Sequence, residues 1–309
     1  MPHLLVFGSI NMDLVISTPA LPRPGQTVVG GNLATIPGGK GANQAVACAR
    51  LGARTSMAGR VGADAFGSQL REHLAGAGVD VGGVGTDATA PTGVALIMVE
   101  PSGQNSIVVA PGANHALTPE HAGGLAGTIA SADALLVQLE VPLAALGRAV
   151  TLAREAGVRV VMDAGPATRL PADLVALTDV ISPNETETEA LTGITPDTPA
   201  RAEQAAGLLL AQGARLVVLK LGERGCLVQS PGEPARHLPA VPIRPVDTTA
   251  AGDAFTAALA VALCEGADPV TAARFANHAG ALAATAFGAQ PSMPTRSALE
   301  QFVQARSKA

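Results

Sequence analysis

Residues 133–165 read "DALLVQLEVPLAALGRAVTLAREAGVRVVMDAG", and this stretch decides the expected fold. Two short apolar runs, 133–140 and 158–165, enclose residues 143–157, whose apolar side chains recur at helical spacing. A strand, a helix and a second strand in this order favour a parallel strand pair with the helix packed on the sheet. The stretch therefore predicts a βαβ unit.

The same alternation continues to the C-terminus. Further strands are expected in "TDVISPN" (178–184) and "RLVVLKLG" (215–222), and further helices over 201–213 and 270–287. We predict an α/β fold: a doubly wound, mostly parallel sheet with helices on both faces. Ligands of such folds bind outside the carboxyl ends of the strands.

The first third of the chain has a different pattern, in which strand-like runs are joined by Pro, Gly and Asn turns without helices between them. These runs are "MDLVIST" (12–18), "QTVVGGNLATI" (26–36) and "TGVALIMVEPSGQNSIVVAPG" (92–112). We expect a small antiparallel β-sheet lid made of residues 12–37 and 92–111. The α/β domain would then comprise residues 1–11, 38–91 and 112–309.

Composition excludes several classes of protein. The chain has 309 residues, of which 48% are hydrophobic, enough for a sizeable core and against disorder. Its 20 basic and 25 acidic residues give a net charge of −5 without a basic run, so no nucleic-acid partner is expected. The cysteines, Cys48, Cys226 and Cys264, lack metal-ligand or disulfide spacing. Without a signal peptide or a spanning apolar segment, we expect a cytoplasmic protein and no membrane partner.

The stretch "VDTTAAGDAF" (246–255) places Asp247 and Asp253 around a run of tiny residues. It follows a strand-like run, 237–246, and precedes an apolar helical pattern, so Ala250–Gly252 would form a helix N-terminus that attracts an anion. A carboxylate there makes sense if Asp253 accepts a proton from an attacking hydroxyl while the amides stabilise a transferring phosphoryl group. The alternative is that Asp253 only caps the helix.

A second glycine-rich turn, "PGGKGANQA" (37–45), also leads into a helical pattern. It is not a P-loop, because Lys40 is followed by Gly41, and no GxGxxG occurs in the chain. The glycines would let the backbone approach a small polar ligand, with Lys40 and Asn43 as hydrogen-bond donors to its hydroxyls. The alternative is an ordinary turn before a helix.

Polar residues also follow several predicted strands. These are Asn11, Asp13, Glu140, Asn184, Glu185 and Glu187. Carboxylates at strand ends would bind sugar hydroxyls or hold Mg²⁺ through water, and the alternative for each is a solvated loop charge. Neither HExxH nor GxSxG occurs, so zinc-protease and serine-hydrolase chemistry have no support.

Together, "PGGKGANQAVACARLG" and "DTTAAGDAF" resemble the two signatures of the ribokinase-like carbohydrate kinases, the PfkB family. The resemblance extends to "GSINMDLV" (8–15), "QLE" (138–140), "SPNETE" (182–187), "LGERG" (221–225) and "GAQPSMP" (288–294). It implies ATP-dependent phosphorylation of D-ribose at the 5-hydroxyl, with Mg²⁺ and an activating K⁺. Other sugar kinases of the family, such as a deoxyribokinase or a fructokinase, and a non-catalytic sugar or nucleotide sensor are the alternatives.

The resemblance also implies roles for individual residues. It makes Asp253 the catalytic base and Ala250, Ala251 and Gly252 its anion hole. Sugar-binding positions are Asn11, Asp13, Gly39, Lys40, Gly41, Asn43 and Glu140. Nucleotide-binding positions are Asn184, Lys220, Gly222, Gly225, Gly252 and Asn277. Glu187 would hold Mg²⁺ through water, and K⁺ would bind Asp247, Thr249, Ala283, Ala286, Gly288 and Ser292. The family also implies a homodimer formed through the lid.

One segment departs from the family pattern. At the end of a predicted strand, Asp163, Ala164 and Gly165 stand where an Asn-Pro pair is common in the family. We expect this departure to leave the core chemistry untouched.

Overall fold

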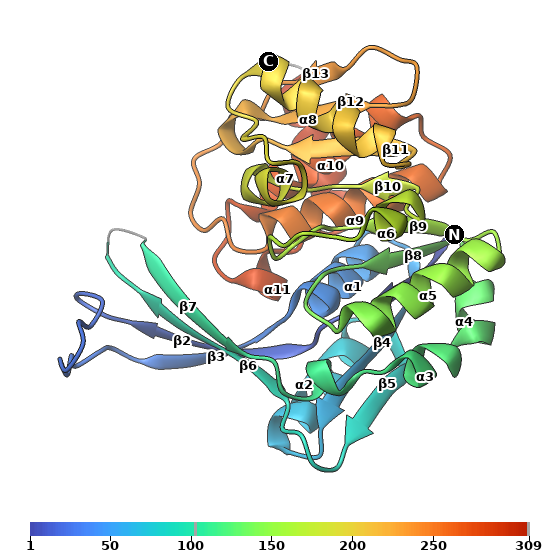
Figure 1. Ribbon diagram of the computed structural model, residues 1–309. Coiled ribbons are helices and arrows are strands. Elements are labelled where there is room, and N and C mark those ends of the chain that lie inside the picture. The colour runs from blue at the N-terminus through green and yellow to red at the C-terminus, as the bar shows by residue number, and fades with distance from the viewer. Residues whose placement is uncertain (102–103, 308–309) are drawn as a thin grey trace.

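The computed structural model describes residues 1–101 and 104–307, and its largest element is a nine-stranded sheet in the order β13-β12-β11-β10-β9-β8-β1-β4-β5 (Figure 1). Its strands are β1 His3–Phe7, β4 Arg54–Gly62, β5 Val79–Asp87, β8 Ala134–Val137, β9 Arg159–Met162, β10 Val180–Ile181, β11 Leu216–Lys220, β12 Cys226–Gln229 and β13 Arg236–Leu238. Neighbouring strands are parallel except at one edge, where β12 is antiparallel to both β11 and β13. The mostly parallel sheet is as predicted.

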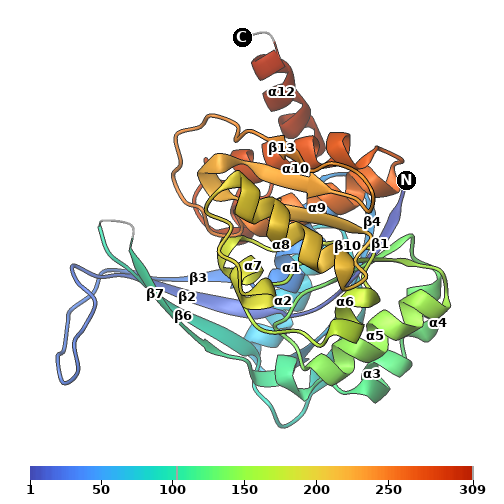
Figure 2. The ribbon, with the colours of Figure 1, turned by 45° about the horizontal axis from the view of Figure 1, so that its top comes forward.

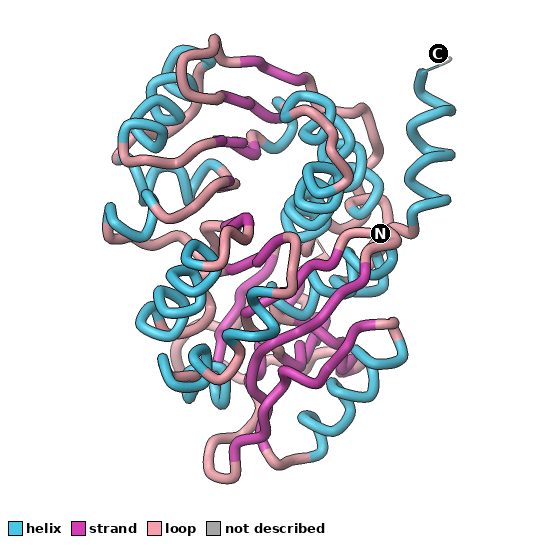
Figure 3. Tube along the Cα trace, turned by 90° about the vertical axis from the view of Figure 1, so that its right-hand side faces the viewer, coloured by secondary structure: helices cyan, strands magenta, loops and turns pink. Residues whose placement is uncertain are grey.

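Helices cover both faces of this sheet (Figure 3). One face carries α1 Lys40–Arg50, α2 Ala65–Gly76, α9 Ala251–Cys264, α10 Pro269–Ala283 and α12 Arg296–Ser307. The other carries α3 Pro119–Gly123, α4 Ala126–Ala130, α5 Leu143–Glu155, α6 Ala172–Ala176 and α8 Pro199–Ala211. Successive residues of β1 divide between the two cores, Leu4 and Val6 on one side and Leu5 and Phe7 on the other, because strand side chains alternate. The prediction of a doubly wound fold is confirmed.

A separate four-stranded sheet projects from this body (Figures 1 and 2). Its order is β3-β2-β6-β7, with β2 Asn11–Ser17, β3 Leu33–Gly38, β6 Gly93–Val99 and β7 Asn105–Ala110. The small sheet is confirmed, but it is not purely antiparallel as predicted, because β2 and β6 pair in parallel. The chain can join them this way since it passes through α1, β4, α2 and β5 before it returns. Residues 102–103 of the predicted lid and residues 308–309 lie outside the described residues.

Two predicted strands are shorter than expected. The strand expected over 26–36 begins only at Leu33, because Gly30 and Gly31 offer no side chains to pack. The strand expected over 237–246 ends at Leu238, because Pro239, Pro242 and Pro245 have no N–H to donate to a ladder. The segment before α9 is therefore a loop.

The remaining elements lie at the loops of the large sheet. They are α7 Glu185–Thr192, α11 Ala289–Ser292 and the 3₁₀ helices η1 Gly112–Ala116 and η2 Gly222–Arg224. Helices α1 and α9 pack against each other on one face of the sheet. In the described ranges, no helix has the length and apolar character needed to cross a membrane.

Candidate active site

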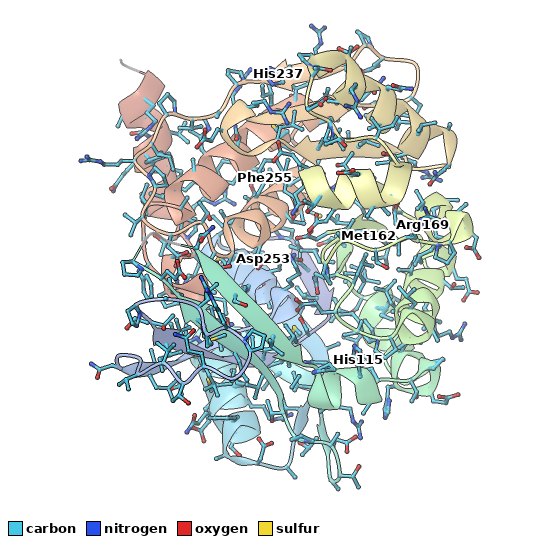
Figure 4. All side chains as sticks on the ribbon, turned by 60° about the vertical axis from the view of Figure 1, so that its left-hand side comes forward. His115, Met162, Arg169, His237, Asp253 and Phe255 are labelled. Carbon is cyan, nitrogen blue, oxygen red and sulfur yellow. The ribbon has the colours of Figure 1, made fainter. Side chains whose placement is uncertain are left out.

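Asp253 lies in the first turn of α9, near the centre of the molecule (Figure 4). The residue is only 3% exposed, and its side chain meets three side chains of α1. Asn43 Nδ2 donates to Oδ2 over 2.9 Å, Gln44 Nε2 donates to Oδ1 over 3.2 Å, and Lys40 Nζ lies 3.9 Å from Oδ1. The N-cap of α9 is Ala250, and no side chain caps this helix. The capping alternative for Asp253 is therefore wrong.

Asp253 has the electrostatics of a proton acceptor. Burial raises its pKa to about 6; Lys40 acts in the opposite direction and Asp163 adds to the rise. A carboxyl group with a pKa close to neutrality remains ionised at pH 7 yet binds a proton more strongly than an exposed aspartate.

The predicted anion hole has an unusual backbone. Ala250 has a φ of 59°, the left-handed value that no other described residue except glycine adopts, and Ala251 N donates to Thr248 O over 3.2 Å. The turn ends the loop abruptly and starts α9, whose first N–H groups have no partner within the helix. A cavity of about 460 Å³ lies over this helix start, lined by Ala250, Gly252 and Asp253 together with residues of α1, α7 and β11.

Two further carboxyl groups converge near Asp253. Burial, followed by the charges of Glu140 and Asp253, raises the pKa of Asp13 to about 7. Glu140 Oε2 accepts hydrogen bonds from Lys40 N, over 3.1 Å, and from Ser9 Oγ. These predicted sugar-binding groups therefore lie within electrostatic reach of each other.

Asn11 is held in one orientation. Its Oδ1 accepts from Asn114 Nδ2 over 2.7 Å, while Asn114 Oδ1 accepts from Ile10 N over 2.9 Å. The Asn11 amide NH₂ is thus left as a donor to a ligand. Sequence reasoning missed Asn114 and Ser9, and the sequence offers no signal for either, since both act through residues distant along the chain.

The glycines of "PGGKGANQA" have a structural role besides the predicted approach to a ligand, which stays a prediction. Gly39 has a φ of 88°, and a Cβ there would lie 2.8 Å from Asn11 N. A Cβ on Gly41 would lie 2.7 Å from Ser9 N. These two glycines let α1 approach the protein's own β1–β2 connection, which positions Lys40 and Asn43.

The predicted nucleotide residues line two adjoining cavities. A cavity of about 470 Å³ includes Lys220, Gly222, Gly225, Gly252 and Asn277, with mainly aliphatic walls. It shares Lys220, Gly222, Thr248 and Gly252 with the 460 Å³ cavity, which also includes Asn184. The two form one path that ends at Asp253. Asn277 Nδ2 donates to Pro239 O over 2.8 Å, which fixes the loop that forms one wall.

Asn184 and Glu187 form a capping box at the start of α7. Asn184 Oδ1 accepts from Glu187 N over 2.9 Å, and Glu187 Oε2 accepts from Asn184 N over 2.7 Å. Glu187 Oε1 remains and faces the cavity end of β9, where a Cβ on Gly165 would lie 2.5 Å from it. Within the described residues, no cluster of three or more His, Cys, Asp or Glu could hold a metal. One available carboxylate oxygen fits a Mg²⁺ that keeps its waters and binds phosphates.

Asp247 contacts two of the other residues predicted to bind K⁺. Its Oδ1 accepts from Thr249 N and its Oδ2 from Gly288 N, each over 2.9 Å. Burial opposes its ionisation, but these hydrogen bonds outweigh burial and lower its pKa. Ala286 N donates to Ala283 O over 3.1 Å and Ser292 Oγ donates to Ala289 O over 2.7 Å. The other predicted K⁺ residues therefore lie at the end of α10, in the connection to α11 and in α11 itself. An ionised carboxylate beside turn carbonyls fits a large monovalent cation.

The expectation that Asp163–Gly165 leave the core chemistry untouched stays a prediction, but the structure places Asp163 in contact with a predicted nucleotide residue, Lys220. Asp163 is fully buried inside the site: its Oδ1 accepts from Lys220 Nζ over 3.0 Å, and its Oδ2 from Gln44 Nε2 over 2.8 Å and Thr256 Oγ1 over 3.3 Å. The available signal was an aspartate directly after an apolar strand, at the end where ligands bind.

Comparison with known proteins agrees with this geometry. Residues 1–296 match the model of the pfkB family carbohydrate kinases, and the chain belongs to this family. It is 40% identical to the ribokinase of Haemophilus influenzae, over 97% of this chain and 98% of that protein. It is 37% identical to the ribokinase of Bacillus subtilis, over 98% of this chain and 100% of that protein. The structure of Arabidopsis thaliana ribokinase complexed with ribose and ATP superposes with a TM-score of 0.92 at 37% identity, covering 98% of this chain and 99% of that one.

Proposed function

We propose that the protein transfers the γ-phosphoryl group of ATP to the 5-hydroxyl of D-ribose, giving D-ribose 5-phosphate and ADP. The observation that carries this proposal is the meeting of the two-part cavity with a buried Asp253 at the helix start of α9. Its relatives named ribokinase match nearly the whole chain, which favours ribose among the sugars.

The chemistry requires one proton acceptor and one anion site. Asp253 accepts the proton of the 5-hydroxyl as that oxygen bonds to the γ-phosphorus, and the bond from phosphorus to the bridging oxygen of ADP breaks. The N–H groups at Ala250–Gly252 donate to the phosphoryl oxygens in flight, for which Ala251 N exchanges its 3.2 Å bond to Thr248 O. Lys40 compensates the charge that gathers beside Asp253, from which its Nζ is 3.9 Å distant.

Ribose would be held by the polar groups below Asp253. Asp13 and Glu140 accept hydrogen bonds from sugar hydroxyls, and Asn43 Oδ1 is a buried acceptor without a recorded partner among the described residues. The Asn11 amide donates to a further hydroxyl, which favours ribose over a sugar that lacks the 2-hydroxyl.

Two cations complete the proposal. Mg²⁺, held through water at Glu187 and by the phosphates, supplies charge neutralisation during transfer. K⁺ at Asp247 and the neighbouring carbonyls would order the anion hole from beneath. Replacing K⁺ by Na⁺ at constant ionic strength should lower turnover; equal turnover would contradict the K⁺ site.

The lid would also join two copies of the chain. Leu33, Leu96 and Val108 are half or more exposed, and all three lie on the face of the small sheet opposite to Asp13. An exposed apolar sheet face of this kind favours association with a second copy.

The direct test is ADP formation measured with D-ribose, 2-deoxyribose and fructose as acceptors. We expect the highest kcat/KM with ribose, and phosphate attached to carbon 5 of the product. A higher kcat/KM with another sugar would change the substrate within the family. Ribose binding without ADP formation would replace the kinase by a sensor.

A further inference from the structure

The Asp163–Lys220 ion pair is nearly free of solvent and stands beside the anion hole. Asp163 is fully buried, the Lys220 side chain is 11% exposed, and Nζ lies 3.0 Å from Oδ1. A Cβ built on Gly252 would lie 3.6 Å from Lys220 Nζ, so the ammonium sits directly over the anion-hole glycine. An ion pair that only stabilised the fold would not need this position.

Lys220 also lies where the two cavities meet. It lines both the larger, aliphatic cavity and the smaller one that contains Asp253. A nucleotide whose base occupies the first and whose terminal phosphate reaches Asp253 must pass its phosphate chain by this ammonium. Lysine Nζ has three N–H donors, and the bond to Asp163 uses one of them, which leaves two for phosphate oxygens.

Asp163 is itself fixed on its other side. Gln44 Nε2 donates to Asp163 Oδ2 and to Asp253 Oδ1, and Gln44 Oε1 accepts from Gln138 Nε2 over 2.6 Å. Burial opposes ionisation of Asp163, but Lys220 and Lys40 outweigh it and lower its pKa. Asp163 is therefore an anionic anchor with every carboxylate oxygen in use, and the anchor connects the phosphate side of the site to the proposed base.

We propose that Asp163 is a positioning residue for phosphoryl transfer, which holds the Lys220 ammonium over Gly252 so that Lys220 contacts the phosphate chain of the nucleotide. This inference rests on the proposed nucleotide site and adds to it a residue with no assigned role. The two lysines then have different partners. Lys40 lies beside Asp253, on the side of the sugar that accepts the phosphoryl group, and Lys220 lies on the side of the nucleotide that donates it.

The test compares ADP with adenosine as ligands of the wild type, Lys220→Met and the double variant Asp163→Asn/Lys220→Met. The contact predicts a loss of about tenfold to a hundredfold in ADP affinity for both variants and no change in adenosine affinity. It also predicts a loss of about 10²-fold in kcat with ribose. Lys220→Arg should recover part of the ADP affinity, because it keeps the charge.

The double variant distinguishes two roles of Lys220. In one, Lys220 contacts the phosphate chain of the nucleotide, a contact called the clamp below; in the other, the ion pair with Asp163 only stabilises the fold. Removing Lys220 alone leaves a buried charge unpaired and should lower the melting temperature, whereas the double variant leaves no unpaired charge. If the double variant has both the melting temperature and the ADP affinity of the wild type, the pair only stabilises the fold and the proposal is wrong. Arg154→Met breaks the partly buried pair with Asp179, 2.8 Å apart and lining a separate cavity, and should leave the ratio of ADP to adenosine affinity unchanged.

These titrations contain no sugar, so they are independent of the acceptor. A wild type that binds ADP as expected but does not phosphorylate ribose would overturn the ribose assignment and leave the clamp intact. Equal loss of ADP and adenosine affinity in Lys220→Met would overturn the clamp and leave the ribose assignment intact.

Discussion

Both sheets contain apolar strands, but the strands of the large sheet are buried and those of the small sheet are partly exposed. Strand β8, Ala134–Val137, is buried along its whole length between two helix layers, whereas β7 exposes Ile107, Val108 and Val109 by 52%, 59% and 49%. The covered sheet holds polar groups at its strand ends in fixed positions. In the small sheet, part of the apolar surface is exposed to solvent. Buried strand ends hold the side chains of the proposed chemistry in place, and exposed apolar strands fit the proposed contact with a second copy.

The largest expected effect concerns the active site beside the nine-stranded sheet. Asp253→Asn removes the proton acceptor while it keeps the shape of the side chain, so kcat should fall by about 10²–10⁴-fold. Because the substitution also removes a buried charge, the melting temperature should not fall. A coupled ADP assay and a thermal melt measure the two quantities.

Asp197→Asn on an exposed ion pair is a suitable control and should keep full activity. Wild-type turnover in Asp253→Asn would exclude this residue as the base.

The next effect tests the exposed sheet. Leu96 lies directly opposite Val108, so Leu96→Lys places a charge in the centre of the proposed interface. The dissociation constant of the dimer should rise by about tenfold to a hundredfold, measured by sedimentation. Val109→Lys is the matched control on the other face of the same sheet.

If Val109→Lys dissociates the dimer and Leu96→Lys does not, the interface uses the face on the Asp13 side. A monomeric wild type would contradict the dimer altogether.

A smaller effect concerns pH. Asp253 must be ionised to accept a proton, and its pKa is raised to about 6. We therefore expect kcat/KM to fall below about pH 6, approaching tenfold per pH unit at the acid limit. Rates between pH 5 and 9 in a constant ionic-strength buffer measure the profile. A flat profile down to pH 5 would contradict the raised pKa.

The smallest effect concerns stability where the two sheets meet. The pKa of Asp13 is raised from 3.8 to about 7, so the folded protein binds a proton more tightly than the unfolded chain between these values. This group's contribution to stability is therefore greatest below about pH 4 and is lost as the pH rises towards 7.

Asp13→Asn should raise the melting temperature of the ligand-free protein by a few degrees at pH 8 and leave it unchanged near pH 4, while KM for ribose rises. An equal shift at both pH values would mean that ionisation of Asp13 carries no cost.

The sequence allowed the doubly wound fold to be predicted because the strand and helix periods in 133–165 alternate without interruption. It also indicated Asp253 and the small residues before it, since tiny side chains at a helix start leave the backbone N–H groups open to an anion. It indicated Asp163 only by its place after an apolar strand, and it did not indicate the partners Lys220, Gln44 and Thr256, which are 57, 119 and 93 positions away. Nor did it reveal that β2 pairs in parallel with β6, because pairing across an intervening α/β segment leaves no local pattern.

The amide chain from Gln138 through Gln44 has a consequence for where protons can go. Amide groups neither gain nor lose a proton near neutral pH, so this chain transmits orientation between the two carboxylates without conducting a proton. In the proposed reaction, a proton accepted by Asp253 would therefore not pass to Asp163 through Gln44.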